Sequence, residues 1–176
     1  VHSDLESFLI SILKKGEPGR AFARQLFAIF QLDHPMLRGI EGRSALKLTD
    51  LQTAVFAWLA QIDYFRQAIA RFGDRVRSLH ADDFLARPAD ALIAASRFLG
   101  LAHDEATIAD VVAGPLLRRD SKDSGRDYGA DERAHERQRI LARHGDEIAF
   151  ILDWARRLRP EAGLRRLERP LVGPEA

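Results

Sequence analysis

"HADDFLARPADALIAASRFLGL", residues 80–101, is the stretch that decides the predicted fold. The segment leading into it, residues 75–81, alternates loosely between polar and apolar side chains, which predicts a short strand. Pro88 suits the first turn of a helix, apolar residues then recur at helical spacing to Leu99, and Gly100 ends the helix. Because a lone strand needs neighbours, we expect the rest of a sheet to be missing from this chain or to lie in a partner.

The acidic pair Asp82 and Asp83 opens this stretch. Residues that are adjacent in sequence do not face each other on a helix, so the two carboxylates are poorly placed as a paired acid and base. One of them can cap the following turn, and both suit the positive end of a helix dipole. We therefore interpret the pair as a helix-start signal rather than a catalytic site.

Helical periodicity covers most of the remaining chain. Ser3 and Glu6 form the pattern of a capping box, and Thr49 or Asp50 suits the cap of a long helix. Gly145 divides the last helical region into two predicted helices. Helices are predicted over about 4–15, from Pro18 through Phe30, and over about 49–72, 104–113, 130–144 and 146–158, with loops at 32–48 and 118–129.

The composition is that of one folded domain of 176 residues, with 46% hydrophobic and 30% charged residues. A net charge of +1 creates no overall attraction to nucleic acid or membrane, and the absence of cysteine excludes disulfides and a cysteine nucleophile. No apolar run reaches membrane-span length and no signal peptide is recognisable, so we expect a cytoplasmic protein without a membrane partner. A helix that begins at residue 4 leaves little chain ahead of it, so we expect truncation.

The histidines and acidic residues form no recognisable metal motif. No two of the six histidines are four residues apart, and there is no H-E-x-x-H. The acidic run "DSKDSGRDYGADE", residues 120–132, does not follow the order of a calcium-binding EF-hand loop. We therefore expect no metal ion. G-x-S-x-G, G-x-G-x-x-G and P-loop motifs are also absent, so no catalytic residue is assigned.

Basic residues gather in the loop 118–129, "RRDSKDSGRDYG". Lys122 and Arg126 of this loop can close over an anionic ligand such as a phosphate, and the alternative is an ordinary solvated loop of mixed charge. Residues 156–169 hold six arginines against two glutamates, but no aromatic residue interleaves them, so nucleic-acid binding is not favoured. We expect the tail, residues 159–176, to be poorly ordered.

Together these features resemble the C-terminal part of a sulfotransferase that uses 3′-phosphoadenosine-5′-phosphosulfate (PAPS). In that family a strand leads into Tyr-Glu-Asp-Leu, then a proline, an amphipathic helix and Phe-Leu-Gly-Leu. Residues 79–101 follow the same order. Asp83 matches the Asp, Pro88 the proline and residues 98–101 the final block, while Ala81 stands in place of the Tyr.

A second match lies at the start of the chain. In the family, the pattern Arg-Asp-Pro-x-Asp-x-x-x-Ser opens a helix, and its Arg and Ser hold the 3′-phosphate of the cofactor. In residues 3–11, "SDLESFLIS", Asp4 matches the first Asp and Ser11 matches the Ser. Ser3 and Leu5 stand in place of the Arg and the Pro. The resemblance implies a phosphate contact at Ser11, and the alternative is an ordinary helical serine.

The resemblance implies an α/β fold, in which residues 1–158 are the mostly helical C-terminal part of a P-loop-type three-layer domain with one or two short strands. It implies transfer of a sulfuryl group from PAPS to a hydroxyl or amine of a small-molecule acceptor, with cofactor contacts from Ser11 and, by position, Lys122 and Arg126. The N-terminal phosphate-binding loop of the family is absent, so we expect no activity from this chain alone. The alternative is a stand-alone, mainly helical interaction domain without catalytic activity.

Overall fold

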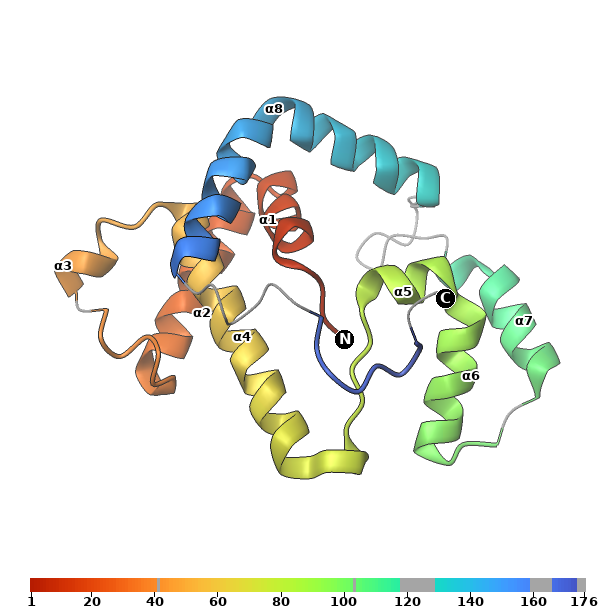
Figure 1. The fold of residues 1–176 in the computed structure, drawn as a ribbon. Coiled ribbons are helices and arrows are strands. Elements are labelled where there is room, and N and C mark those ends of the chain that lie inside the picture. Colours follow the sequence, from red (N-terminus) through yellow and green to blue (C-terminus); the bar gives the residue numbers. More distant parts are fainter. Residues whose placement is uncertain (41, 103, 118–128, 159–165, 174–176) are drawn as a thin grey trace.

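The described part of the chain is mostly helical (Figure 1). The computed structural model describes residues 1–173 apart from residues 41, 103, 118–128 and 159–165. No helix within these ranges combines the length and the apolar character needed to cross a bilayer. The helices are α1 (Leu5–Lys14), α2 (Glu17–Asp33), α3 (Gly42–Ala45), α4 (Asp50–Phe72), α5 (Ala81–Ala86), α6 (Pro88–Leu99), α7 (Glu105–Ala113) and α8 (Ala130–Leu158), with 3-10 turns at Gly73–Arg75 and Pro115–Leu117.

The first of two helix groups consists of α1, α2, α3, α4 and α8 (Figure 1). Its buried side chains form a large hydrophobic cluster, contributed mainly by α1, α4 and α8, and a smaller one around Phe27 and Phe56. α1 packs against α2, α4 and α8, and α4 also packs against α2. Leu5, Leu9 and Ile12 follow one another at helical spacing along α1 and are almost fully buried against Val55 and Ile148. Burial of one such side chain contributes about 1.5–3 kcal/mol. Tertiary packing of this stripe therefore stabilises a helix that is too short to be stable alone.

Local signals determine where the long helices begin and end. The amide of Gln52 donates to the Thr49 side chain, and the amide of Thr49 donates to the Gln52 side chain, which forms a capping box at the start of α4. Gly73 and Gly100 end α4 and α6, and both have positive φ angles, which a residue without a side chain adopts at no steric cost.

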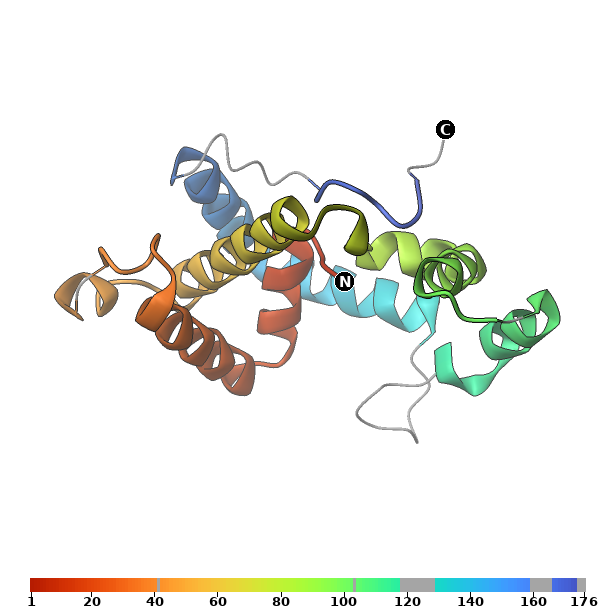
Figure 2. The ribbon, with the colours of Figure 1, turned by 90° about the horizontal axis from the view of Figure 1, so that it is seen from below.

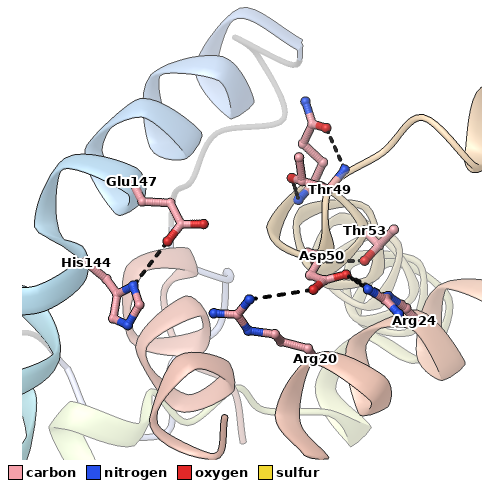
Figure 3. Close-up of polar contacts among 8 residues, drawn as sticks. Arg20, Arg24, Thr49, Asp50, Thr53, His144 and Glu147 are labelled. Carbon is pink, nitrogen blue, oxygen red and sulfur yellow. Dashed lines mark hydrogen bonds and ion pairs between the residues drawn. The ribbon is translucent and has the colours of Figure 1, made fainter. Parts of the chain in front are cut away.

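Ion pairs join α2 to the start of α4. Figure 3 shows Arg20 and Arg24 pointing toward Asp50, with His144 and Glu147 nearby on α8. Arg24 Nε donates to Asp50 Oδ1 at 2.6 Å, and an Arg20 nitrogen lies 3.9 Å from the other carboxylate oxygen. Exposed pairs contribute at most about 1 kcal/mol each, so these contacts help to orient the helices but do not account for the stability of the group.

The second group, α5 to α7, has a much smaller core. α6 packs against α5 and α7, and the buried residues of these three helices are Ala91 and Ile108. Residues 166–173 run between the two groups (Figure 2). Leu167 is buried in the core of the first group, and Arg87 of the second group donates to a carbonyl in the same segment. This segment therefore connects the two groups.

The α/β prediction is wrong, because the described residues contain no strand or sheet and the protein is all-α. The region 75–81, predicted as a strand, forms only isolated parallel bridges, from His80 to His2 and from Ser78 to Pro170. The segment before α1 offers one paired residue and then enters the helix, so no hydrogen-bonded ladder develops. A three-layer P-loop-type arrangement is not formed by these residues.

The last helical region is one helix rather than the predicted two. α8 runs without a break from Ala130 to Leu158 and passes through Gly145. Ile148 and Ile151 of α8 pack into the core of the first group. This packing stabilises the second half of the helix, so tertiary contacts override the poor helix propensity of one residue.

Candidate functional site

Three chain segments lie side by side between the two helix groups (Figure 1). The amide of His2 donates to the carbonyl of Leu79 at 2.9 Å, and the amide of Ala81 donates to the carbonyl of His2 at 2.8 Å. On the other side, the amide of Ser78 donates to the carbonyl of Arg169 at 2.9 Å. We call the three segments, residues 1–4, 76–83 and 166–172, the junction.

Two segments of the junction lead directly into helices. Asp4 is the N-cap of α1 and accepts a hydrogen bond of 2.6 Å from the amide of Ser7, which replaces the capping box predicted one residue earlier. His80 is the N-cap of α5, and its Nδ1 accepts a hydrogen bond of 3.3 Å from the amide of Asp82. Asp82 and Asp83 lie in the first turn of α5, where the helix dipole favours negative charge. The acidic pair therefore marks a helix start, as predicted, but the side chain that caps the helix is that of His80 rather than an aspartate.

Two histidine rings face each other in the junction. The ring centroids of His2 and His80 are 5.0 Å apart, and the ring planes are almost perpendicular, at 84°. Burial, reinforced by His80, the N-terminal amine and Arg166, lowers the pKa of His2 to about 4, and Asp83 opposes the shift. His2 is therefore neutral at pH 7 and adds no positive charge to the junction.

Carboxylates gather around the His80 ring. Arg166 Nη1 donates to both carboxylate oxygens of Asp83, at 2.6 and 2.8 Å. Asp82 Oδ2 lies 3.7 Å from His80 Nδ1. One nitrogen or oxygen from each of Asp4, His80 and Asp82 lies within 4.8 Å of the others. The junction thus brings together an imidazole and two carboxylates from distant parts of the chain.

A cleft of about 570 Å³ lies between α5, α6, α7 and the beginning of α8. Phe84, Pro88 and Val112 contribute to an apolar wall, and the first turns of α8 contribute polar side chains. Leu117 and Gly129, which flank residues 118–128 on either side, both line the cleft. The volume is in the range typical of small-molecule sites.

Of the three predicted cofactor contacts, the described residues include Ser11 alone. Ser11 lies in α1, half-buried, and does not line the cleft. Lys122 and Arg126 lie outside the described residues. Spacing arguments missed the cluster at His80 because its members are far apart in sequence. The sequence did show that residues 1–4 and residues 75–81 each precede the start of a helix, and this pattern could have indicated that the two segments are related.

Comparison of the chain with protein-family models, with curated proteins and with solved structures found no match. Its function therefore has to be inferred from the junction and the cleft.

Proposed function

We propose that the chain is the C-terminal part of a sulfotransferase-like protein that transfers a sulfuryl group from PAPS to a hydroxyl or amine acceptor. The observation that carries the proposal is the backbone pairing of His2 with Leu79 and Ala81. The two segments that resemble the family, residues 3–11 and 79–101, lie at this pairing, and each leads into a capped helix. Segments selected by their motifs alone are thus neighbours in space, which supports the resemblance.

The cleft supports the nucleotide part of the proposal. Residues 118–128 contain Lys122 and Arg126, and both flanking residues, Leu117 and Gly129, line the cleft. An adenine ring has flat apolar faces and polar edges, which suit a cleft with one apolar and one polar wall. The phosphates would receive charge-assisted hydrogen bonds from the two basic side chains.

The chemistry assigned to this chain is nucleotide binding rather than a complete catalytic step. Sulfuryl transfer develops charge on the transferred group and on the leaving phosphate, so positioned donors provide much of the rate enhancement. Ser3 stands where the family pattern has an arginine, and a serine cannot replace the bidentate guanidinium contact. No catalytic base is assigned, so the chain alone is proposed to bind the nucleotide without turnover.

Isothermal titration calorimetry of the chain with adenosine 3′,5′-bisphosphate tests the proposal. We expect binding of one nucleotide, and much weaker binding of adenosine, which lacks the phosphates. Arg126→Ala should weaken binding about tenfold or more, because a hydrogen bond to a charged group contributes about 1.5–3 kcal/mol. Ser11→Ala should leave the affinity unchanged, because Ser11 does not line the cleft in which the nucleotide is proposed to bind. Arg43→Ala, an exposed arginine in α3 that does not line the cleft, is the matched control and should have no effect.

Absence of binding, or equal affinity in wild type and Arg126→Ala, would contradict the proposal. Either result would favour the alternative, a helical interaction domain without catalytic activity. One observation speaks for that alternative: Phe22, Ile29 and Leu32 of α2 are 44%, 57% and 82% exposed. Their spacing places them along one side of the helix.

A further inference from the structure

We propose that the exposed face of α2 binds α2 of a second copy of this chain, with the two helices antiparallel. The residues that form this face are Phe22, Gln25, Ile29 and Leu32, which we call the α2 stripe. Figure 2 shows α2 at an edge of the first helix group, so one of its faces points away from α1 and α4. None of the stripe residues is among those that line the cleft, so the proposal does not depend on the proposed nucleotide binding.

α2 has two apolar faces, and one of them packs within the chain. Gly19, Ala23 and Phe27 are buried where α2 packs against α1 and α4. The large apolar residues of the α2 stripe are exposed, and at about 100° per residue they lie on a different side of the helix from the buried set. The core of the chain therefore explains one apolar face of α2 and leaves the other unexplained.

The spacing of the α2 stripe indicates what kind of element covers it. Its residues recur at intervals of three, four and three, which is the spacing of the a and d positions of a coiled coil. Three of them are large and apolar, and all of them are exposed. An apolar row at this spacing packs against a second helix that lies nearly along it. The stripe therefore fits a helix better than a loop or a small molecule.

The α2 stripe is complementary to itself when two copies run in opposite directions. A twofold interface requires that, where one residue contacts another, the same contact recurs with the copies exchanged. Antiparallel alignment places Phe22 opposite Leu32 of the second copy, and Gln25 opposite Ile29, and the twofold axis repeats both contacts in reverse. Ala28 is exposed beside the axis, and its small side chain allows the two helices to approach closely.

Charge at the two ends of the α2 stripe favours the antiparallel direction. Lys15 Nζ lies 6.0 Å from the centre of the Phe22 ring, at one end of the stripe. Asp33 is exposed and follows Leu32 at the other end. Antiparallel pairing brings Lys15 of each copy toward Asp33 of the other, whereas parallel pairing would bring like charges together. Opposite charges across an interface select the partner and fix the register, so the second copy itself supplies the complementary charges.

Sedimentation equilibrium of the full chain, over a range of concentrations, tests the proposal. We expect an equilibrium between monomer and dimer. Ile29→Glu and Leu32→Glu should each weaken dimerisation about tenfold or more, because each places a charge in an apolar contact. Both side chains are exposed in the single chain, so the variants should keep the helix content of the wild type by circular dichroism. Leu99→Glu is the matched control, because Leu99 is an exposed leucine at the end of α6 in the second helix group. It should leave dimerisation unchanged.

Cross-linking tests the antiparallel register. The chain contains no cysteine, so a single introduced cysteine is the one thiol that can react. Ala28→Cys should give a linked dimer with a short bis-maleimide, because residue 28 lies beside the twofold axis. Phe22→Cys should not, since at 1.5 Å per residue the two copies of residue 22 would be about 15 Å apart along the helices.

The proposal is overturned if the chain stays a monomer at every concentration, which would leave the α2 stripe to a different protein. It is also overturned if Ile29→Glu and Leu32→Glu both dimerise as tightly as the wild type. Linking of Phe22→Cys without linking of Ala28→Cys would overturn the antiparallel arrangement. None of these results affects the nucleotide titration, which is read through Arg126.

Discussion

Among single residues, His2 has the clearest consequence for stability. Its pKa is lowered from 6.5 to about 4 in the folded chain, first by burial of the ring and then by nearby positive groups. Between these two pH values the unfolded chain binds more protons than the folded chain, so acid favours unfolding there. The stabilisation from a neutral His2 is complete above pH 6.5, is lost as the pH falls toward 4, and does not change further below that.

We predict that the free energy of unfolding in urea falls by about 1 kcal/mol more in wild type than in His2→Gln between pH 7 and pH 4. The full pKa shift would correspond to about 3 kcal/mol, but solvent screening of the partly exposed ring reduces it. The difference between the two proteins isolates this residue from other titrating groups. A difference that stays constant over this pH range would show that the folded pKa of His2 is not lowered.

The burial of His34 could not be predicted from the sequence. The residue is 1% exposed, its Nδ1 accepts the amide hydrogen of Met36 at 3.3 Å, and its Nε2 lies 3.2 Å from Asp63 Oδ2. In the sequence it is a polar residue beside a proline in a predicted loop. Its burial depends on α4, whose position no local pattern specifies. The acidic pair at the start of α5 could be interpreted because a helix start is a local feature.

At the scale of the helices, Gly145 marks a difference between prediction and structure that mutation can test. An added Cβ at this position meets no atom within 4 Å, and the φ angle is not positive. Glycine in a helix interior costs about 0.5–1 kcal/mol relative to alanine. We therefore predict that Gly145→Ala raises the free energy of unfolding in urea by about that amount.

Gly73→Ala is the control for this prediction, because its φ of +55° strains any residue with a side chain. It should destabilise the protein. If α8 were interrupted at Gly145 as the sequence suggested, alanine there would give no gain in stability.

The ends of α4 and α6 could be predicted, and the missing sheet could not, for one physical reason. Caps and glycine ends such as Thr49, Gly73 and Gly100 act within a few residues, so the sequence contains the whole signal. A strand exists only through its neighbours. Residues 75–81 have a suitable pattern, but each adjacent segment contributes a single bridge. The junction had the same obstacle, because the cluster around His80 depends on the register between two distant segments.

At the scale of the whole molecule, the two helix groups have very unequal cores. The first group buries large side chains from α1, α4 and α8, including Leu9, Ile62 and Ile148. The helices of the second group bury Ala91 and Ile108. Buried apolar area determines how much free energy a local opening requires, so the second group should open more readily than the first.

Native-state hydrogen exchange measures this difference directly. We predict that amides of α6 and α7 exchange through a partial opening of lower free energy than the opening that exposes α1 and α4. Leu9→Ala should lower the free energy of the global opening by about 2–5 kcal/mol, because it leaves a cavity in the larger core. Ile108→Ala should lower the free energy of opening of α6 and α7 and leave that of α1 and α4 unchanged. Exchange of all helices at one common free energy would contradict this prediction. It would mean that residues 166–173 couple the two groups into one cooperative unit, because Leu167 is buried in the first group and Arg87 of the second group donates to the carbonyl of Gly173.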